Sequence, residues 1–139
     1  MEQPAGNKIT GNPSSHPALS VKWVEDFPDI PLNRNEAYKL RVTSKGVEIE
    51  AITETGVYRA IQTLRQLTEK KGNGIAITGC EITDWPAFRI RGFMQDVGRT
   101  YISTDELKRE IAILARYKIN VFHWHLTENQ AWRLQSKVF

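Results

Sequence analysis

The stretch from residue 89 to residue 126 constrains the fold most, because it predicts one helix between two strands. Residues 89–97 and 121–126 have the apolar composition of strands, and the second of them is nearly all apolar. Such a run is typical of a strand buried on both faces. A strand, a helix and a strand within about forty residues predict a βαβ unit with parallel strands and a right-handed crossover.

The helix of this unit has a clear start signal. Ser103 followed by Glu106 three residues later predicts a capping box, in which each side chain binds the other residue's backbone N–H. Asp105 and Glu106 are therefore interpreted as capping groups and not as a catalytic acid pair. The helix is expected to reach about Lys118. The side chains that it is expected to bury are Leu107, Ile111, Leu114 and Ala115.

The upstream half predicts a small antiparallel sheet covered by a helix. Residues 38–42 and 47–51 alternate apolar and charged side chains around a turn at 44–46, which indicates a hairpin with one solvated face. Thr53 is the expected N-cap of a helix over about residues 54–70. Its apolar positions share one face and can cover the hairpin.

Glycine and proline set the expected boundaries. Gly72 and Gly74 are expected to end the helix, so that Glu69, Lys70 and Lys71 lie at its C-terminus, and a strand is expected over residues 74–82. Pro86 ends this first unit, because proline cannot donate to a strand ladder. The predicted organisation is a flexible leader over residues 1–18, an α+β domain over 19–85 and the start of a second domain over 86–139. A short strand is expected at residues 22–24.

Composition excludes several classes of function. The net charge is +3, but 19 Lys and Arg residues are scattered among 16 acids, which argues against a nucleic-acid partner. Cys80 is the only cysteine, so no internal disulfide can form, and its apolar neighbours indicate a small buried side chain. No apolar run approaches the ~20 residues of a membrane span. Residues 1–13 are polar and lack the apolar core of a signal peptide.

Two charged residues follow the predicted parallel strands directly. Arg99 and Glu128 each lie just past a strand's C-terminal end, where α/β proteins place their ligand groups. The arginine fork suits carboxylates or sugar hydroxyls. A solvated loop charge or a local salt bridge is the alternative for either residue. Asp96 is expected to support Arg99, and Arg91, at the strand start, is expected to be structural.

The second strand also carries two histidines. His123 and His125 are two residues apart, so both point to the same face, and with Glu128 they could form a zinc site. The favoured alternative is that both imidazoles hydrogen-bond inside the sheet, so no metal site is predicted. Trp124 faces the opposite way and is expected to pack under helices. Trp132 either stacks on a ligand or covers the core.

Several strings together resemble one enzyme family. They are residues 91–99 (Arg-Gly-Phe-Met-Gln-Asp-Val-Gly-Arg), 117–120 (Tyr-Lys-Ile-Asn) and 121–130 (Val-Phe-His-Trp-His-Leu-Thr-Glu-Asn-Gln), followed by Trp132-Arg133. These strings resemble the family 20 glycoside hydrolases, which are β-N-acetylhexosaminidases. Residues 56–67 are similar to the helix of the accessory α/β domain that precedes the barrel in this family.

The resemblance implies a (β/α)8 barrel that removes terminal N-acetyl-hexosamines from glycans with retention. The 2-acetamido oxygen of the substrate is the nucleophile, an Asp orients it and the adjacent Glu is the general acid. Arg99 matches the arginine that binds hydroxyls of the terminal sugar, and Glu128 matches an acid that pairs with a downstream His. Two departures are Glu128-Asn129, where the family commonly has Asp-Asp, and Thr100, where it often has His.

Length limits what the resemblance implies for this polypeptide. A complete barrel needs about 250 residues, so residues 86–139 correspond to one βαβ unit of an incomplete (β/α)8 barrel. The catalytic Asp-Glu pair belongs to a later strand, so no catalytic residue and no cofactor are expected here. The chain alone is expected to be inactive, to form a homodimer through exposed barrel strands, and to come from a secreted or periplasmic parent. The alternatives are a non-catalytic module and a metal-dependent hydrolase that uses His123 and His125.

Overall fold

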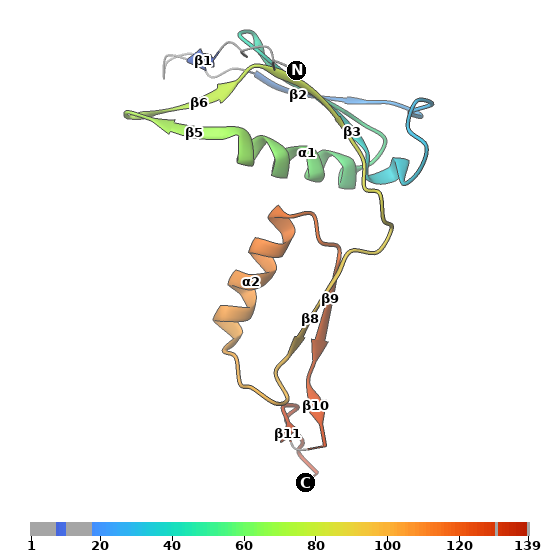
Figure 1. The fold of residues 1–139 in the computed structure, drawn as a ribbon, viewed down its shortest axis with the longest axis vertical. Coiled ribbons are helices and arrows are strands. Elements are labelled where there is room, and N and C mark those ends of the chain that lie inside the picture. The colour runs from blue at the N-terminus through green and yellow to red at the C-terminus, as the bar shows by residue number, and fades with distance from the viewer. Residues whose placement is uncertain (1–7, 11–17, 130, 139) are drawn as a thin grey trace, which may run out of the picture. The chain divides into compact units, whose positions relative to one another are not determined.

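The computed structural model describes residues 8–10, 18–129 and 131–138. Within these residues the chain has a mixed α+β fold that divides into two compact units between Arg89 and Ile90 (Figure 1). The predicted leader falls largely outside the described residues, at 1–7 and 11–17. Lys8–Thr10 form strand β1, and Ala18 already belongs to the next strand, so these parts of the leader prediction are wrong.

The N-terminal unit is built on a four-stranded sheet with the order β2-β4-β3-β7. Strand β2 runs parallel to β4, whereas β3 is antiparallel to both β4 and β7. The hairpin of β3 and β4 confirms the prediction from alternating side chains, since Leu40 pairs with Ile49 in register. The strands are β2 (Ala18–Trp23), β3 (Tyr38–Thr43), β4 (Gly46–Ala51) and β7 (Cys80–Asp84).

Helix α1 (Glu54–Leu67) covers one face of this sheet. Thr53 is the N-cap, as predicted, and its hydroxyl accepts a hydrogen bond from the Gly56 N–H at 3.3 Å. Fully burying a Leu or Ile side chain stabilises the folded state by about 1.5–3 kcal/mol, so this layer is the main source of the unit's stability. Its buried residues are Tyr38, Leu40, Val42, Val47, Ile49 and Ala60, with Val57, Ile61, Leu64 and Leu67 packed against them.

The chain after Leu67 differs from the prediction. The helix ends there, and a second hairpin follows in which β5 (Thr68–Lys71) pairs with β6 (Gly74–Thr78), which also pairs with β1. Gly72 has a φ of 58°, a left-handed conformation that glycine adopts readily and that suits a tight turn. The residues Glu69, Lys70 and Lys71 therefore lie in a strand and not at a helix C-terminus.

The expected single strand over residues 74–82 is also divided in two. Strand β6 pairs with β5, whereas β7 pairs with β3 of the other sheet, and Gly79 lies between them. Cys80, the first residue of β7, is half-buried, and this burial raises the pKa of its thiol. That agrees with its interpretation as a small apolar side chain and not as a reactive one.

A buried ion pair fixes the start of α1. Arg59 of α1 is ion-paired with Glu36 of the short 3-10 helix η1 (Arg34–Glu36), with 2.9 Å between Nη2 and Oε2. The backbone approaches closely here, because a Cβ atom at Gly56 would lie 2.5 Å from the carbonyl oxygen of Ala37. Glycine is thus required where the helix meets the segment after η1.

The C-terminal unit is a βαβ unit followed by a small hairpin. Strands β8 (Gly92–Asp96) and β9 (Val121–His125) are parallel, with α2 (Thr104–Arg116) between them in the chain, which confirms the prediction. The hairpin consists of β10 (Thr127–Glu128) and β11 (Ala131–Trp132). The predicted capping box is present, since the Ser103 hydroxyl accepts from the Glu106 N–H at 3.2 Å and Glu106 Oε2 accepts from the Ser103 N–H at 3.1 Å.

Burial in this unit is lower than the sequence predicts. Trp124 is 47% exposed and Val121 is exposed too, so β9 is not buried on both faces. Leu107 of α2 is buried, but Ile111 is exposed. The reason is that β9 has one paired neighbour, β8, within the described residues. No helix among these residues combines the length and apolar character needed to cross a membrane.

The ends of the elements shift by a few residues from their predicted positions. Strand β8 begins at Gly92 and not at Arg89, and α2 ends at Arg116, two residues before Lys118. Lys118 has a φ of 61°, which takes the chain out of the helix. Its carbonyl oxygen accepts a hydrogen bond from Arg91 Nε at 2.8 Å, in line with the structural role expected for Arg91.

Candidate functional site

The carboxyl ends of β8 and β9 bring together the charged residues that the sequence singled out. Asp96 is the last residue of β8, Arg99 lies three residues further on, and Glu128 belongs to β10, just beyond β9. The pairing continues past the end of β8, because the Val97 N–H donates to the His125 carbonyl oxygen at 3.0 Å. The parallel register therefore sets the distances within the site.

Two carboxylates hold the Arg99 guanidinium. Its Nε lies 2.9 Å from Asp96 Oδ2, and its Nη2 donates to Glu128 Oε1 at 3.1 Å. The backbone N–H of Arg99 also donates to Asp96 Oδ1 at 3.1 Å. Both carboxylate side chains are half-buried, whereas the side chain of Arg99 is 66% exposed. The guanidinium is thus anchored at one edge and exposes its remaining N–H groups.

The same contacts keep both carboxylates charged. The pKa of Asp96 is lowered, first by the hydrogen bond from the Arg99 backbone N–H and then by the Arg99 charge. The pKa of Glu128 is lowered by the hydrogen bond from the Asn129 backbone N–H, and further by the hydrogen bond and charge of Arg99. A carboxylate that is already ionised well below neutral pH is a poor proton donor. Neither residue is suited to act as a general acid.

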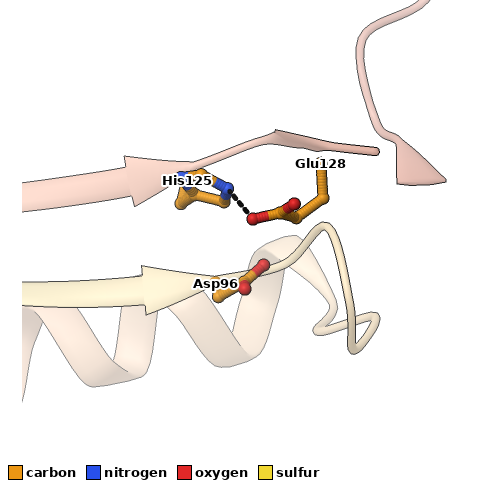
Figure 2. Close-up of side chains that lie close together, drawn as sticks. All are labelled: Asp96, His125 and Glu128. Carbon is orange, nitrogen blue, oxygen red and sulfur yellow. Dashed lines mark ion pairs between the residues drawn. The ribbon is translucent and has the colours of Figure 1, made fainter. Parts of the chain in front are cut away.

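His125 lies beside these carboxylates, as Figure 2 shows. Its Nε2 is 3.4 Å from Glu128 Oε1, which is within ion-pair distance but too long for a good hydrogen bond. This nitrogen is buried and has no hydrogen-bond partner within the described part of the chain. The imidazole ring therefore lies beside the Glu128 carboxylate without a good hydrogen bond to it.

The three side chains of Figure 2 are also of the types that bind metals. One ligand atom each from Asp96, His125 and Glu128 lies within 4.8 Å of the others. The histidine pair considered from the sequence is not what the structure assembles: Asp96 takes the place of His123. The reason is strand geometry, since His123 lies about 6.6 Å further from the strand end, two residues back along β9.

Arg99 makes this cluster a poor metal site. Its guanidinium contacts both carboxylates, so a divalent ion would have to compete with a cation that already offsets part of their charge. The arrangement fits an anchored arginine better than a metal centre.

Arg133 is the residue that sequence reasoning missed. Its Nε donates to the Val97 carbonyl oxygen at 2.8 Å and its Nη2 to the Gly98 carbonyl oxygen at 3.3 Å. Its guanidinium also lies 5.8 Å from the centre of the Tyr101 ring. Arg133 stood within one of the family-like strings, but neither its spacing nor its neighbours signalled this contact, which joins residues 35 or 36 positions apart.

The two tryptophans of the C-terminal unit are exposed, whereas Gly98 lies within the site. Trp124 is exposed and does not pack under a helix as expected, and Trp132 is 65% exposed. Gly98 is buried between the two carboxylates: a Cβ atom there would lie 3.2 Å from Asp96 Oδ1 and 3.3 Å from Glu128 Cβ. A larger residue would push the two sides of the site apart.

Comparison with known proteins identifies the family. Residues 4–85 match the model of "Glycosyl hydrolase family 20, domain 2", and residues 88–139 match the model of "Glycosyl hydrolase family 20, catalytic domain". The chain therefore belongs to glycosyl hydrolase family 20. This bears out the resemblance noted in the sequence.

Relatives and solved structures agree with this assignment. A β-hexosaminidase of Porphyromonas gingivalis is 42% identical over 145 residues, which cover 99% of this chain and 17% of that protein. A β-N-acetylhexosaminidase of Cellulomonas fimi is 40% identical over 84% of this chain and 24% of its own length. The crystal structure of a β-N-acetylhexosaminidase from Bacteroides fragilis matches with a TM-score of 0.75 and 37% identity, over 86% of this chain and 23% of that one.

Some of the related structures contain a sugar. The exo β-N-acetylglucosaminidase of Vibrio harveyi in complex with N-acetylglucosamine matches with a TM-score of 0.72 and 36% identity, over 86% of this chain and 18% of that one. The chain thus spans between 16% and 26% of these and other related proteins, among them the β-hexosaminidase of Vibrio furnissii and the β-N-acetylhexosaminidase of Streptomyces coelicolor.

Proposed function

We propose that this chain is the N-terminal part of a β-N-acetylhexosaminidase that removes terminal N-acetyl-hexosamine residues from glycans. In this proposal residues 19–85 form the accessory α/β domain, and residues 86–139 form the first strand, helix and strand of a (β/α)8 barrel. The two family matches, which meet near residue 86, and the division between Arg89 and Ile90 support this organisation.

The observation that carries the proposal is the anchoring of Arg99. An arginine held on two ionised carboxylates at the C-terminal end of parallel strands lies where barrel enzymes bind their substrates. Its exposed N–H groups have the fork geometry that suits adjacent sugar hydroxyls. In this role Arg99 binds the terminal sugar, and Asp96 and Glu128 orient it and neutralise its charge.

The reaction itself needs groups outside this site. Because Asp96 and Glu128 are ionised and ion-paired, neither can protonate the leaving oxygen. The proposed mechanism is substrate-assisted and retaining, with the 2-acetamido oxygen as nucleophile and an Asp-Glu pair on a later barrel strand. This chain supplies substrate binding and the supporting network, but no catalytic acid.

A chimera tests the proposal. The chain replaces the aligned stretch of the Porphyromonas gingivalis β-hexosaminidase, and release of chromophore from an aryl N-acetylglucosaminide is measured for the chimera and for the isolated chain. We expect turnover by the chimera and none by the isolated 139-residue chain. A folded chimera without activity, or turnover by the pure chain, would contradict the proposal.

We also propose that the isolated chain associates with a second copy through its C-terminal unit. Strands β8 and β9 form a two-stranded sheet, and large apolar side chains on both strands, Phe93, Met94 and Trp124 among them, are exposed. Exposed apolar strands of this kind tend to pair with another chain. Sedimentation velocity should therefore reveal a dimer that Trp124→Glu disrupts and the control Trp132→Glu does not. A chain that stays monomeric at high concentration would exclude this association.

A further inference from the structure

Arg133 connects the two segments that build the candidate site. One segment is the loop after β8, which carries Arg99, and the other is the hairpin of β10 and β11, which carries Glu128. The guanidinium of Arg133 reaches back from the end of that hairpin to the carbonyl oxygens of Val97 and Gly98. Its own backbone N–H donates to the Leu126 carbonyl oxygen at 3.1 Å, which ties it to the end of β9.

We propose that Arg133 is a positioning residue, which fixes the loop of Arg99 against the hairpin of Glu128 by binding the carbonyl oxygens of Val97 and Gly98. This role rests on the proposed function, in which Arg99 binds the terminal sugar and Arg133 holds the loop of Arg99 in position for that contact. Arg133 itself contacts no reacting atom in this proposal.

The backbone of the loop explains why such a residue is needed. Val97 and Gly98 are both buried, and buried carbonyl groups need hydrogen-bond partners. The Val97 N–H donates to the His125 carbonyl oxygen of β9, and the Val97 carbonyl oxygen accepts a hydrogen bond from Arg133 Nε. Without Arg133 the loop would keep two attachments, the Val97 N–H on β9 and the Arg99 side chain on Glu128, and would lose those at the Val97 and Gly98 carbonyl oxygens, next to Arg99.

The planar fork of arginine suits this position. Nε and Nη2 lie on the same edge of the guanidinium and bind two successive carbonyl oxygens, which a lysine ammonium can match at one point only. The contact with the Tyr101 ring adds less, because that ring is largely exposed. The two carbonyl contacts therefore carry the positioning role.

Arginine side-chain NMR on the 139-residue chain tests this role without any sugar. The Nε–H of Arg99, ion-paired with Asp96, reports on the site, and the Nε–H of Arg91, bound to the Lys118 carbonyl oxygen, reports on the fold of the same unit. In Arg133→Met we expect hydrogen exchange at Arg99 to become about tenfold faster while exchange at Arg91 stays unchanged. The matched control is Arg109→Met on the exposed face of α2, which should change neither.

A second variant distinguishes a local effect at Arg99 from destabilisation of the whole C-terminal unit. Arg133→Lys should give an intermediate rate at Arg99, about threefold faster than in the parent chain, since one carbonyl contact is kept. Unchanged exchange at Arg99 in Arg133→Met overturns the proposal. So does equal loss of protection at Arg91 and Arg99 in both variants, which would mean that Arg133 stabilises the unit as a whole.

Kinetic measurements on the hexosaminidase chimera distinguish a failure of the positioning role of Arg133 from a failure of the proposed function. There, Arg133→Met should raise KM for the N-acetylglucosaminide more than it lowers kcat, and should add little to the effect of Arg99→Met. If Arg133→Met frees Arg99 by NMR but hydrolysis is unchanged, the positioning role holds and the sugar-binding role of Arg99 fails.

Discussion

Replacing Arg99 by methionine in the hexosaminidase chimera is expected to lower kcat/KM about 10²- to 10⁴-fold. A hydrogen bond from a charged donor contributes about 1.5–3 kcal/mol, and the exposed fork of Arg99 offers at least two to a sugar. The loss also leaves Asp96 and Glu128 close together without the cation that neutralises them. The measurement is steady-state hydrolysis of an aryl N-acetylglucosaminide.

Two further variants serve as controls for the fork geometry of Arg99 and for the loss of one positive charge. Arg99→Lys keeps the charge but loses the fork, so it should recover only part of the activity. Arg109→Met removes the same charge from an exposed position on α2 and should leave kcat/KM unchanged. Activity of Arg99→Met within threefold of the parent chimera would exclude a direct role of Arg99 in binding the sugar.

The largest loss of stability is expected for Arg59→Met in the N-terminal unit. The side chains of Arg59 and Glu36 are 8% and 17% exposed, so the substitution removes a buried guanidinium from a half-buried carboxylate. Breaking one side of such a pair typically costs about 3–5 kcal/mol of unfolding free energy. Urea unfolding followed by circular dichroism should reveal a transition at a much lower urea concentration.

The controls for Arg59 come from the same helix. Arg65→Met removes an exposed arginine of α1 and should change the unfolding free energy by less than about 0.5 kcal/mol. The double variant Arg59→Met with Glu36→Gln should recover part of the loss, because the half-buried negative charge that Arg59 offsets is then gone as well. Equal midpoints for Arg59→Met and Arg65→Met would disprove the energetic role of the buried pair.

Features with local causes were predictable from the sequence. The capping box of Ser103 and Glu106, the N-cap at Thr53 and the hairpin of β3 and β4 depend on side chains a few residues apart, and all three are present. The ends of elements were less predictable. Helix α1 stops at Leu67, since the next four residues pair with β6, and that choice depends on contacts with another strand.

The site was predictable in part for the same reason. Arg99 and Glu128 could be selected because each follows the end of an apolar strand. The arrangement of Asp96 beside His125 could not, because it depends on the register of β8 against β9, which places these two residues opposite each other. His123 lies two residues back along β9 and is not part of the cluster of Asp96, His125 and Glu128.

The amino-acid sequence alone determined the family, the βαβ unit and the two charged residues at its strand ends, since these follow from local patterns and a long characteristic string. Only the tertiary structure decided which groups meet. It placed Arg99 between Asp96 and Glu128, and it brought Arg133 onto the loop of Val97 and Gly98. The physical reason is that strand pairing and loop closure join residues about 30 positions apart, and no local pattern encodes that distance.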